Sequence, residues 1–253
     1  MDHSIPKAGS DQNRADRGAT FLLVHGSWHH GGLWTAVRHC LDSAGVPSLA
    51  PTLAGHGPGD ERRGVTHDDY VDSVLAALDA ESAPVTLVGH SLGGSVVSRV
   101  AELRPELCRS LVYYAAFVPR DGESVAEALP RTMIELFDQM AASSKDDSCS
   151  LPYAQFRSAF VNTADEAAAK AIHPHLVPEP RGPIFETLTL PGLRRFEIPT
   201  AYIHCRDDRS LPPGTFHPGQ SKRLKNPKVL EIDGDHEALL TAPERLARAL
   251  LAA

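Results

Sequence analysis

The sequence predicts a protein of the α/β class, with a mostly parallel sheet that carries helices on both faces. Short apolar runs recur along the chain, and amphipathic helical segments lie between them. A length of 253 residues with 42% hydrophobic residues is enough for one such domain and an insertion. Parallel strands that alternate with helices require crossover connections, which place helices on both faces of the sheet.

The individual elements follow from these patterns. Five apolar runs are predicted strands, at residues 21–24, 85–88, 111–116, 201–205 and 228–232. Between the first two runs, helical spacing over residues 33–41 ends before Gly45, a predicted C-terminal cap, and a second helix covers residues 70–78. A last helix closes the chain, and Thr241 and Glu244 predict a capping box at its start.

Two stretches depart from the alternation of strands and helices. Residues 1–19 are polar and are predicted to be a flexible N-terminal tail. Residues 120–197 are rich in proline and contain a helical patch that includes Met133, Phe137 and Met140. We interpret them as a helical cap inserted into a core formed by residues 20–119 and 198–253.

Composition argues against several classes of function. The net charge is −7 with both signs interspersed, which is unlike a nucleic-acid-binding surface. No apolar run approaches the ~20 residues that span a bilayer, and residues 1–19 lack the apolar core of a signal peptide. The four cysteines are far apart with no CxxC pair, which argues against a zinc or redox motif. We therefore expect a cytoplasmic protein that contacts neither nucleic acid nor membrane.

The segment Gly89-His90-Ser91-Leu92-Gly93 matches the G-x-S-x-G pattern of a nucleophile elbow. An apolar strand precedes it and a helix follows it, as that motif requires. The tight turn strains the backbone of Ser91, so the residues two positions away on each side must be small. The pattern predicts that Ser91 is a nucleophile, and the backbone N–H of Leu92 is then the first donor to an oxyanion.

The second oxyanion donor is expected in the loop after the first strand, which ends at the same edge of the sheet. We assign it to the backbone N–H of Ser27, with that of Trp28 as the alternative, because a sequence does not define loop geometry. The neighbouring histidines 25, 29 and 30 resemble a metal cluster, but no carboxylate or cysteine stands at ligand spacing near them. We expect no metal.

A serine nucleophile needs a histidine base, and that histidine needs a carboxylate to orient it. Only His236 follows the last predicted strand and precedes the final helix, so it is the predicted base. The acid should follow the preceding strand, where Asp207 and Asp208 compete. Asp208 is preferred, and Asp207 is interpreted as a solvated loop charge. Asp235 is disfavoured because side chains of consecutive residues point apart at a strand end.

Residues 24–34, 88–94, 115–119 and 202–212 together resemble the compact α/β hydrolases that include plant methylesterases of the salicylic-acid-binding type and hydroxynitrile lyases. The resemblance covers about residues 20 to 253. It implies an α/β-hydrolase fold, a catalytic triad that matches Ser91, His236 and Asp208, main-chain donors that match Ser27 and Leu92, and no cofactor. The N-terminal tail departs from the family pattern.

The resemblance implies hydrolysis of a carboxylic ester through an acyl-enzyme, with a methyl ester or lactone of a small to medium apolar acid as substrate. Trp28, His90 and Phe137 are expected to contact this small molecule, and a homodimer is an option for the assembly. Ordinary packing of the cap explains its apolar side chains equally well: Leu136, Phe137, Phe156 and Phe160.

Two other functions are compatible with the same fold. One is a cofactor-free lyase of the hydroxynitrile lyase type, which uses the same serine and histidine. The related plant lyases carry a lysine after the histidine and a cysteine after the serine, where this chain has Glu237 and Leu92. A carboxylate at Glu237 is expected to repel a departing cyanide. The other function is a small-molecule receptor with little catalytic activity.

Overall fold

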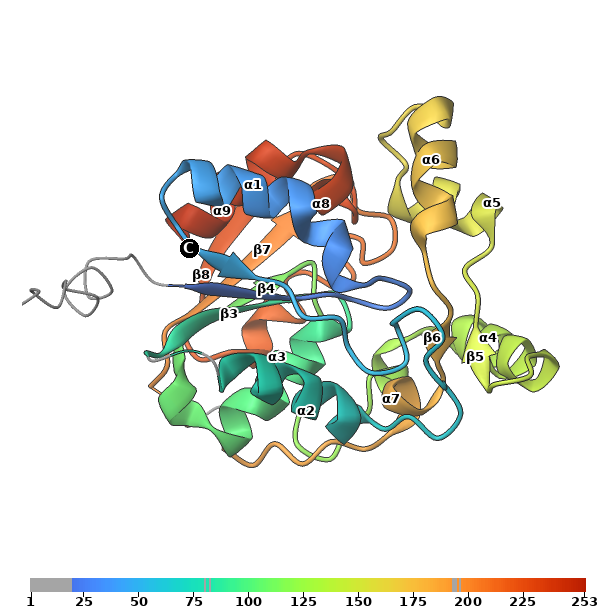
Figure 1. The fold of residues 1–253 in the computed structure, drawn as a ribbon, viewed down its shortest axis with the longest axis horizontal. Coiled ribbons are helices and arrows are strands. Elements are labelled where there is room, and N and C mark those ends of the chain that lie inside the picture. Colours follow the sequence, from blue (N-terminus) through green and yellow to red (C-terminus); the bar gives the residue numbers. More distant parts are fainter. Residues whose placement is uncertain (1–19, 80, 82, 193–194, 196) are drawn as a thin grey trace, which may run out of the picture.

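The computed structural model describes residues 20–253 except 80, 82, 193, 194 and 196 (Figure 1). The predicted tail at residues 1–19 lies outside the described residues. A six-stranded sheet forms the centre, with strand order β2-β1-β3-β4-β7-β8 and every neighbouring pair parallel. The predicted fold class is confirmed.

The five predicted strands are present with small differences at their ends. They are β1 (Phe21–Val24), β3 (Val85–His90), β4 (Cys108–Tyr114), β7 (Thr200–Cys205) and β8 (Lys228–Ile232). Strand β4 ends at Tyr114 because Ala115 has a φ of 42°, which is incompatible with extended backbone. Strand β2 (Ser48–Leu49) was not predicted, because two residues are too few to show a period.

Helices cover both faces of the sheet (Figure 1). Helices α1 (Thr35–Ser43), α8 (Ala238–Thr241) and α9 (Pro243–Ala252) lie on one face, and α2 (His67–Leu78) and α3 (Gly93–Leu103) lie on the other. Each face has its own buried apolar cluster; Trp34 and Leu246 belong to the first, and Tyr70 and Val96 to the second. Burial on both faces is the reason why the central strands are rich in apolar residues.

Two helix ends test the capping predictions. Gly45 has a φ of 77° just after α1, as a C-terminal cap requires. The predicted capping box of Thr241 and Glu244 is wrong, because Thr241 ends α8 and Ala242 precedes α9 without a side-chain cap. The Thr241 hydroxyl donates instead to Asp235 Oδ1 at 2.8 Å.

Between β4 and β7 the chain forms a separate group of short elements beyond the carboxyl ends of the strands (Figure 1). Its elements are α4 (Arg131–Ser143), β5 (Ser148–Cys149), α5 (Tyr153–Gln155), α6 (Glu166–Ile172), β6 (Glu179–Pro180) and α7 (Gly182–Phe185). Strands β5 and β6 pair antiparallel, so the segment also contains a small sheet. The boundaries of a cap at 120 and 197 stay a prediction. Within the described residues, no helix is both long and apolar enough to cross a membrane.

Candidate active site

Ser91 lies in the tight turn between β3 and α3. Its φ of 51° falls in the left-handed region, which is strained for a serine. Glycine is required beside this turn, because a Cβ on Gly89 would lie 2.5 Å from the carbonyl oxygen of Gly93. The packing therefore holds Ser91 in the strained conformation and directs it to the carboxyl edge of the sheet.

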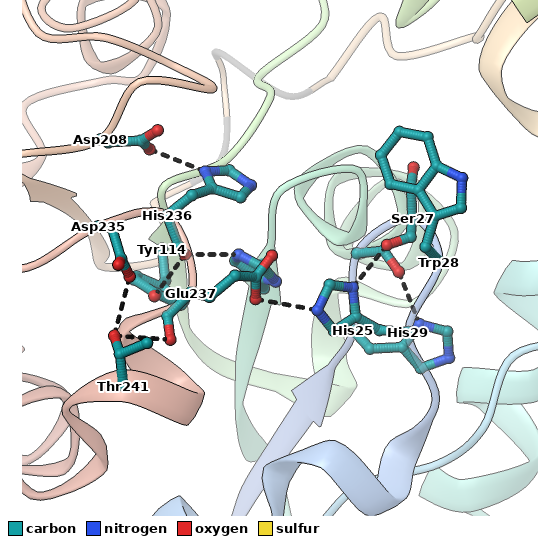
Figure 2. A network of polar contacts seen from close by, with 12 residues as sticks. His25, Ser27, Trp28, His29, Tyr114, Asp208, Asp235, His236, Glu237 and Thr241 are labelled. Atoms are coloured by element: carbon teal, nitrogen blue, oxygen red, sulfur yellow. Dashed lines mark hydrogen bonds and ion pairs between the residues drawn. The ribbon is translucent and has the colours of Figure 1, made fainter. Parts of the chain in front are cut away.

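His236 follows β8 and is oriented by Asp208, which follows β7 (Figure 2). The His236 Nδ1 atom lies 2.8 Å from Asp208 Oδ2. The other oxygen of Asp208 accepts from the backbone N–H groups of Ser210 and Leu211, each at 2.8 Å. Because the carboxylate can only accept, His236 carries its proton on Nδ1. Its Nε2 atom is buried and has no hydrogen-bond partner among the described residues.

The other two aspartates near His236 have different partners. Asp207 is exposed, and its Oδ2 accepts from the N–H of Gly234 at 3.3 Å. Asp235 is fully buried, and its Oδ2 accepts from both the N–H and the hydroxyl of Thr163. Of the three candidates, the structure thus brings Asp208 to the imidazole, and Asp235 ties the loop that carries His236 to the segment between β4 and β7.

The backbone and the pKa of His236 are also set by buried neighbours. Its carbonyl oxygen accepts from the Tyr114 hydroxyl at 2.8 Å and faces His90 Nε2 at 3.2 Å. Burial acts to lower the pKa of His236, but the nearby carboxylates, Asp208 above all, outweigh burial and raise it above the usual 6.5. The ring is therefore a stronger base than a free histidine.

The loop after β1 packs directly against Ser91. A Cβ on Gly26 would lie 2.7 Å from the Cβ of Ser91, so only glycine permits this approach. The Trp28 N–H donates to Glu179 Oε2 at 3.0 Å, which removes Trp28 as the alternative oxyanion donor. Within the described part of the chain, no acceptor engages the backbone N–H of Ser27 or Leu92.

His25 holds the peptide group that carries the Ser27 N–H. The His25 Nε2 atom accepts from the Leu53 N–H at 3.0 Å, so the proton of the neutral ring lies on Nδ1. That Nδ1–H donates to the carbonyl oxygen of Gly26 at 2.9 Å. Since burial lowers the pKa of His25 well below 6.5, the ring is neutral. The carbonyl of Gly26 and the N–H of Ser27 share one peptide plane, so this bond also orients the N–H.

A cavity of about 300 Å³ opens at Ser91. Trp28 and Phe137 line it together with Ser27, Leu92 and Phe160, and their contact with a substrate stays a prediction. His90 does not line the cavity, and its expected contact with the substrate is wrong. The His90 ring stacks on Tyr114 at 4.8 Å and contacts the backbone of His236, so it lies behind His236 rather than in the cavity.

Glu237 is placed differently from the expectation too. Its side chain is fully buried, does not line the cavity, and bonds through Oε2 to His29 Nε2 at 2.9 Å (Figure 2). The Nδ1 atom of His29 faces the carbonyl oxygen of Ser27 at 2.5 Å. Burial acts to lower the pKa of His29, but Glu237 raises it overall. A protonated His29 neutralises the carboxylate, so Glu237 has little charge left to repel an anion.

One group of side chains has the composition of a metal site. His29, His90 and Glu237 each offer a ligand atom, and these atoms lie within 4.8 Å of one another. Imidazole and carboxylate ligands would suit zinc or another divalent transition metal. The hydrogen bond from His29 to Glu237 already uses two of the three ligands, and all three residues are fully or almost fully buried. The absence of a metal stays a prediction.

Known proteins are similar to this chain in sequence and in fold. Residues 21–249 match the family described as Alpha/beta hydrolase family. Salicylic acid-binding protein 2 of Nicotiana tabacum is 28% identical, over 92% of this chain and 96% of that protein. A carbendazim hydrolyzing esterase of Nocardioides sp. is 41% identical over 118 residues, and the match spans only about half of each protein, 46% of this chain and 49% of the esterase.

A solved structure is similar over nearly the whole length. It is an extracellular alpha/beta-hydrolase from a Paenibacillus species, described as sharing structural and functional homology with the tobacco salicylic acid-binding protein 2. The two chains superpose with a TM-score of 0.89 at 35% sequence identity, over 93% of this chain and 99% of the other. The resemblance expected from the sequence is therefore confirmed.

Proposed function

The chain belongs to the alpha/beta hydrolase family, and we propose that it is a carboxylic ester hydrolase that cleaves its substrate through an acyl-enzyme formed on Ser91. One observation carries this proposal. Asp208 holds His236 with its proton on Nδ1, which leaves the Nε2 lone pair free to accept a proton. Ser91, which lines the adjacent cavity, is the donor of that proton.

The proposed reaction has two halves. The Ser91 Oγ atom attacks the ester carbonyl as its proton moves to His236 Nε2, and the backbone N–H groups of Ser27 and Leu92 stabilise the oxyanion. The bond to the leaving oxygen then breaks, and His236 returns the proton to release the alcohol. In the second half, water attacks the carbonyl carbon of the acyl-enzyme and gives a proton to His236. The bond from that carbon to Ser91 Oγ then breaks, His236 returns the proton to Oγ, and the acid is released.

The shape and lining of the cavity support an apolar acyl or aryl group. Trp28 stacks on Phe137 at 5.7 Å, and Phe160 packs edge-on against Trp28 at 5.6 Å. These rings form an apolar wall beside Ser91, and a cavity of about 300 Å³ suits a small to medium substrate. We propose a methyl ester or a lactone of such an acid. A cytoplasmic location and the homodimer stay predictions.

Labelling with a fluorophosphonate tests the nucleophile, and a panel of methyl esters, aryl esters and lactones tests the substrate class. We expect stoichiometric labelling of Ser91 and turnover of apolar methyl or aryl esters. A receptor without catalytic activity would bind such ligands without turning them over. Labelling at another residue would contradict the proposed mechanism.

The pH dependence of kcat/KM should follow the protonation of His236. Protonated His236 cannot accept the proton of Ser91, so activity is lost as the pH falls through the pKa of His236. Because the carboxylates raise this pKa, we expect the midpoint of the acidic limb above pH 6.5. The measurement is kcat/KM for a neutral ester from about pH 5 to about pH 9 at constant ionic strength. This range brackets the titration of a histidine. A midpoint below 6.5 would contradict the assignment of His236 as the base.

The proposed hydrolase is distinguished from a cyanohydrin lyase by a second measurement. The residue after His236 is Glu237, which is buried and paired with His29, so position 237 offers no cationic side chain to departing cyanide. We expect hydrolysis of p-nitrophenyl acetate and no release of cyanide from mandelonitrile above the uncatalysed rate. Cyanide release that disappears in Ser91→Ala would favour the lyase.

A further inference from the structure

Trp28 is held at three points by the segment between β4 and β7. Its N–H donates to Glu179 Oε2 at 3.0 Å, and its carbonyl oxygen accepts from the Val177 N–H at 2.8 Å. Its indole Nε1–H donates to the carbonyl oxygen of Cys149 at 2.8 Å. Cys149 and Glu179 face each other in the pair formed by β5 and β6, so this small sheet receives both the backbone and the side chain of Trp28.

The backbone of Trp28 needs this support. Its φ of 63° lies in the left-handed region, which is strained for a bulky residue. Such a conformation persists only where surrounding contacts maintain it. The contacts from Val177 and Glu179 act on the two peptide groups that flank the Trp28 Cα atom, so they fix its φ and ψ angles together.

Glu179 is a buried carboxylate, and both of its oxygens are hydrogen-bonded. It is 0% exposed, and its Oε2 atom accepts hydrogen bonds from the Trp28 N–H and from His56 Nε2, the latter at 2.9 Å. Its Oε1 atom accepts from the Tyr70 hydroxyl at 2.9 Å. A buried carboxylate is costly unless it is paired and hydrogen-bonded. These donors come from the loop after β1, the loop before α2 and α2 itself, so Glu179 connects three core segments.

The bond from Trp28 to Glu179 bears on the neighbouring oxyanion donor. The Trp28 N–H and the Ser27 carbonyl belong to one peptide group, and that carbonyl faces His29 Nδ1 at 2.5 Å. The peptide is thus held on one side by Glu179 and on the other by His29. The preceding peptide, which carries the Ser27 N–H, is held by His25. With both flanking peptides fixed, the Ser27 N–H is held in one orientation at the cavity that Ser91 also lines.

We propose that Glu179 is a positioning residue for ester hydrolysis, which holds the Ser27 N–H in place for the oxyanion. The proposal rests on the proposed function, in which that N–H stabilises the transition state. It assigns to the segment between β4 and β7 a role in catalysis besides lining the cavity. Hydrogen-bond donors must be in place before the reaction to lower its barrier, so a displaced Ser27 should reduce kcat more than it changes substrate binding.

The test compares Glu179→Ala, Glu179→Gln and Glu186→Ala in the full-length chain. Glu186 is a matched control, because its carboxylate also connects this segment to the core by accepting the N–H of His67 at 2.7 Å, and among the described residues it makes no hydrogen bond to the loop after β1. Glutamine at position 179 can still accept the Trp28 N–H and can donate to the Tyr70 oxygen. It should therefore rescue the positioning role.

We expect Glu179→Ala to lower kcat for p-nitrophenyl acetate by about 10- to 100-fold with KM within about threefold, since losing a whole oxyanion donor costs about 10²- to 10³-fold. Glu179→Gln should keep kcat within about fivefold of wild type. Glu186→Ala should lower the melting temperature and leave kcat within about threefold. If Glu179→Ala does not fold, Glu179→Asp keeps the charge, shortens the reach to Trp28, and should lower kcat in the same way.

The rate of Ser91 labelling by a fluorophosphonate provides a second readout, because the phosphoryl oxygen occupies the oxyanion position and labelling needs no ester turnover. It should fall in parallel with kcat. Folded Glu179→Ala with wild-type kcat and labelling rate would overturn the proposal, as would equal losses of kcat in Glu179→Ala and Glu186→Ala. A wild-type protein that is labelled at Ser91 but turns over no ester would contradict the proposed function, and the labelling rates would still test Glu179.

Discussion

Ser91→Ala is expected to lower kcat for an ester substrate by at least about 10⁴-fold, because the variant lacks the oxygen that forms the acyl-enzyme. Folding should be unaffected. Alanine has the same Cβ in the strained turn, and the Ser91 hydroxyl makes no hydrogen bond to another described residue. Steady-state kinetics and the melting temperature check the two parts of this prediction.

A second cavity-lining hydroxyl provides the control. Thr215 lines the same cavity but has no place in the proposed reaction, so Thr215→Ala should retain kcat within about threefold, as is usual for a substitution outside the catalytic groups. Turnover by Ser91→Ala within tenfold of wild type would exclude Ser91 as the nucleophile.

Asp208→Asn is expected to lower kcat by about 10³- to 10⁴-fold. The asparagine oxygen can keep the bonds to the N–H groups of Ser210 and Leu211, which turns its NH₂ group toward His236 Nδ1. Because Nδ1 must then accept, the proton of the neutral ring moves to Nε2, where it blocks proton transfer from Ser91. The loss should therefore appear in kcat while the melting temperature changes little.

Asp207→Asn is the paired control, and kcat should stay within about threefold of wild type. Asp207 is exposed and its carboxylate contacts the Gly234 N–H, a bond that asparagine can also accept. A larger loss of kcat in Asp207→Asn than in Asp208→Asn would reverse the assignment of the acid.

The fold class and the three triad candidates could be predicted from the sequence because their signals are local. An apolar run before Gly89-His90-Ser91-Leu92-Gly93 defines a buried strand and a tight turn without reference to the rest of the chain. Parallel strands bring their carboxyl ends to one edge, so residues that follow β3, β7 and β8 had to lie near one another. Chain order alone therefore brought Ser91, the aspartate pair and His236 together.

The tertiary structure decided what depends on side-chain direction. Asp207 and Asp208 are equivalent in sequence, and the turn after β7 sends only Asp208 to His236. His90 is adjacent to Ser91 in the sequence, yet its ring packs against Tyr114 and the backbone of His236. A local pattern places a residue at an edge of the sheet, but the direction of its side chain depends on turn angles and packing partners that come from elsewhere in the chain.

Glu179 is the clearest example of a residue that the sequence alone could not identify. It lies in a proline-rich stretch with no motif, where a glutamate is typical of a solvated loop. Its partners Trp28, His56 and Tyr70 belong to segments far away along the chain. The sequence by itself determined the sheet, the tight turn at Ser91 and the candidate base His236 through short-range patterns. Only the tertiary structure decided which aspartate contacts His236, which backbone N–H beside Ser91 stays free and which buried carboxylate lies behind it, because these depend on contacts between distant segments.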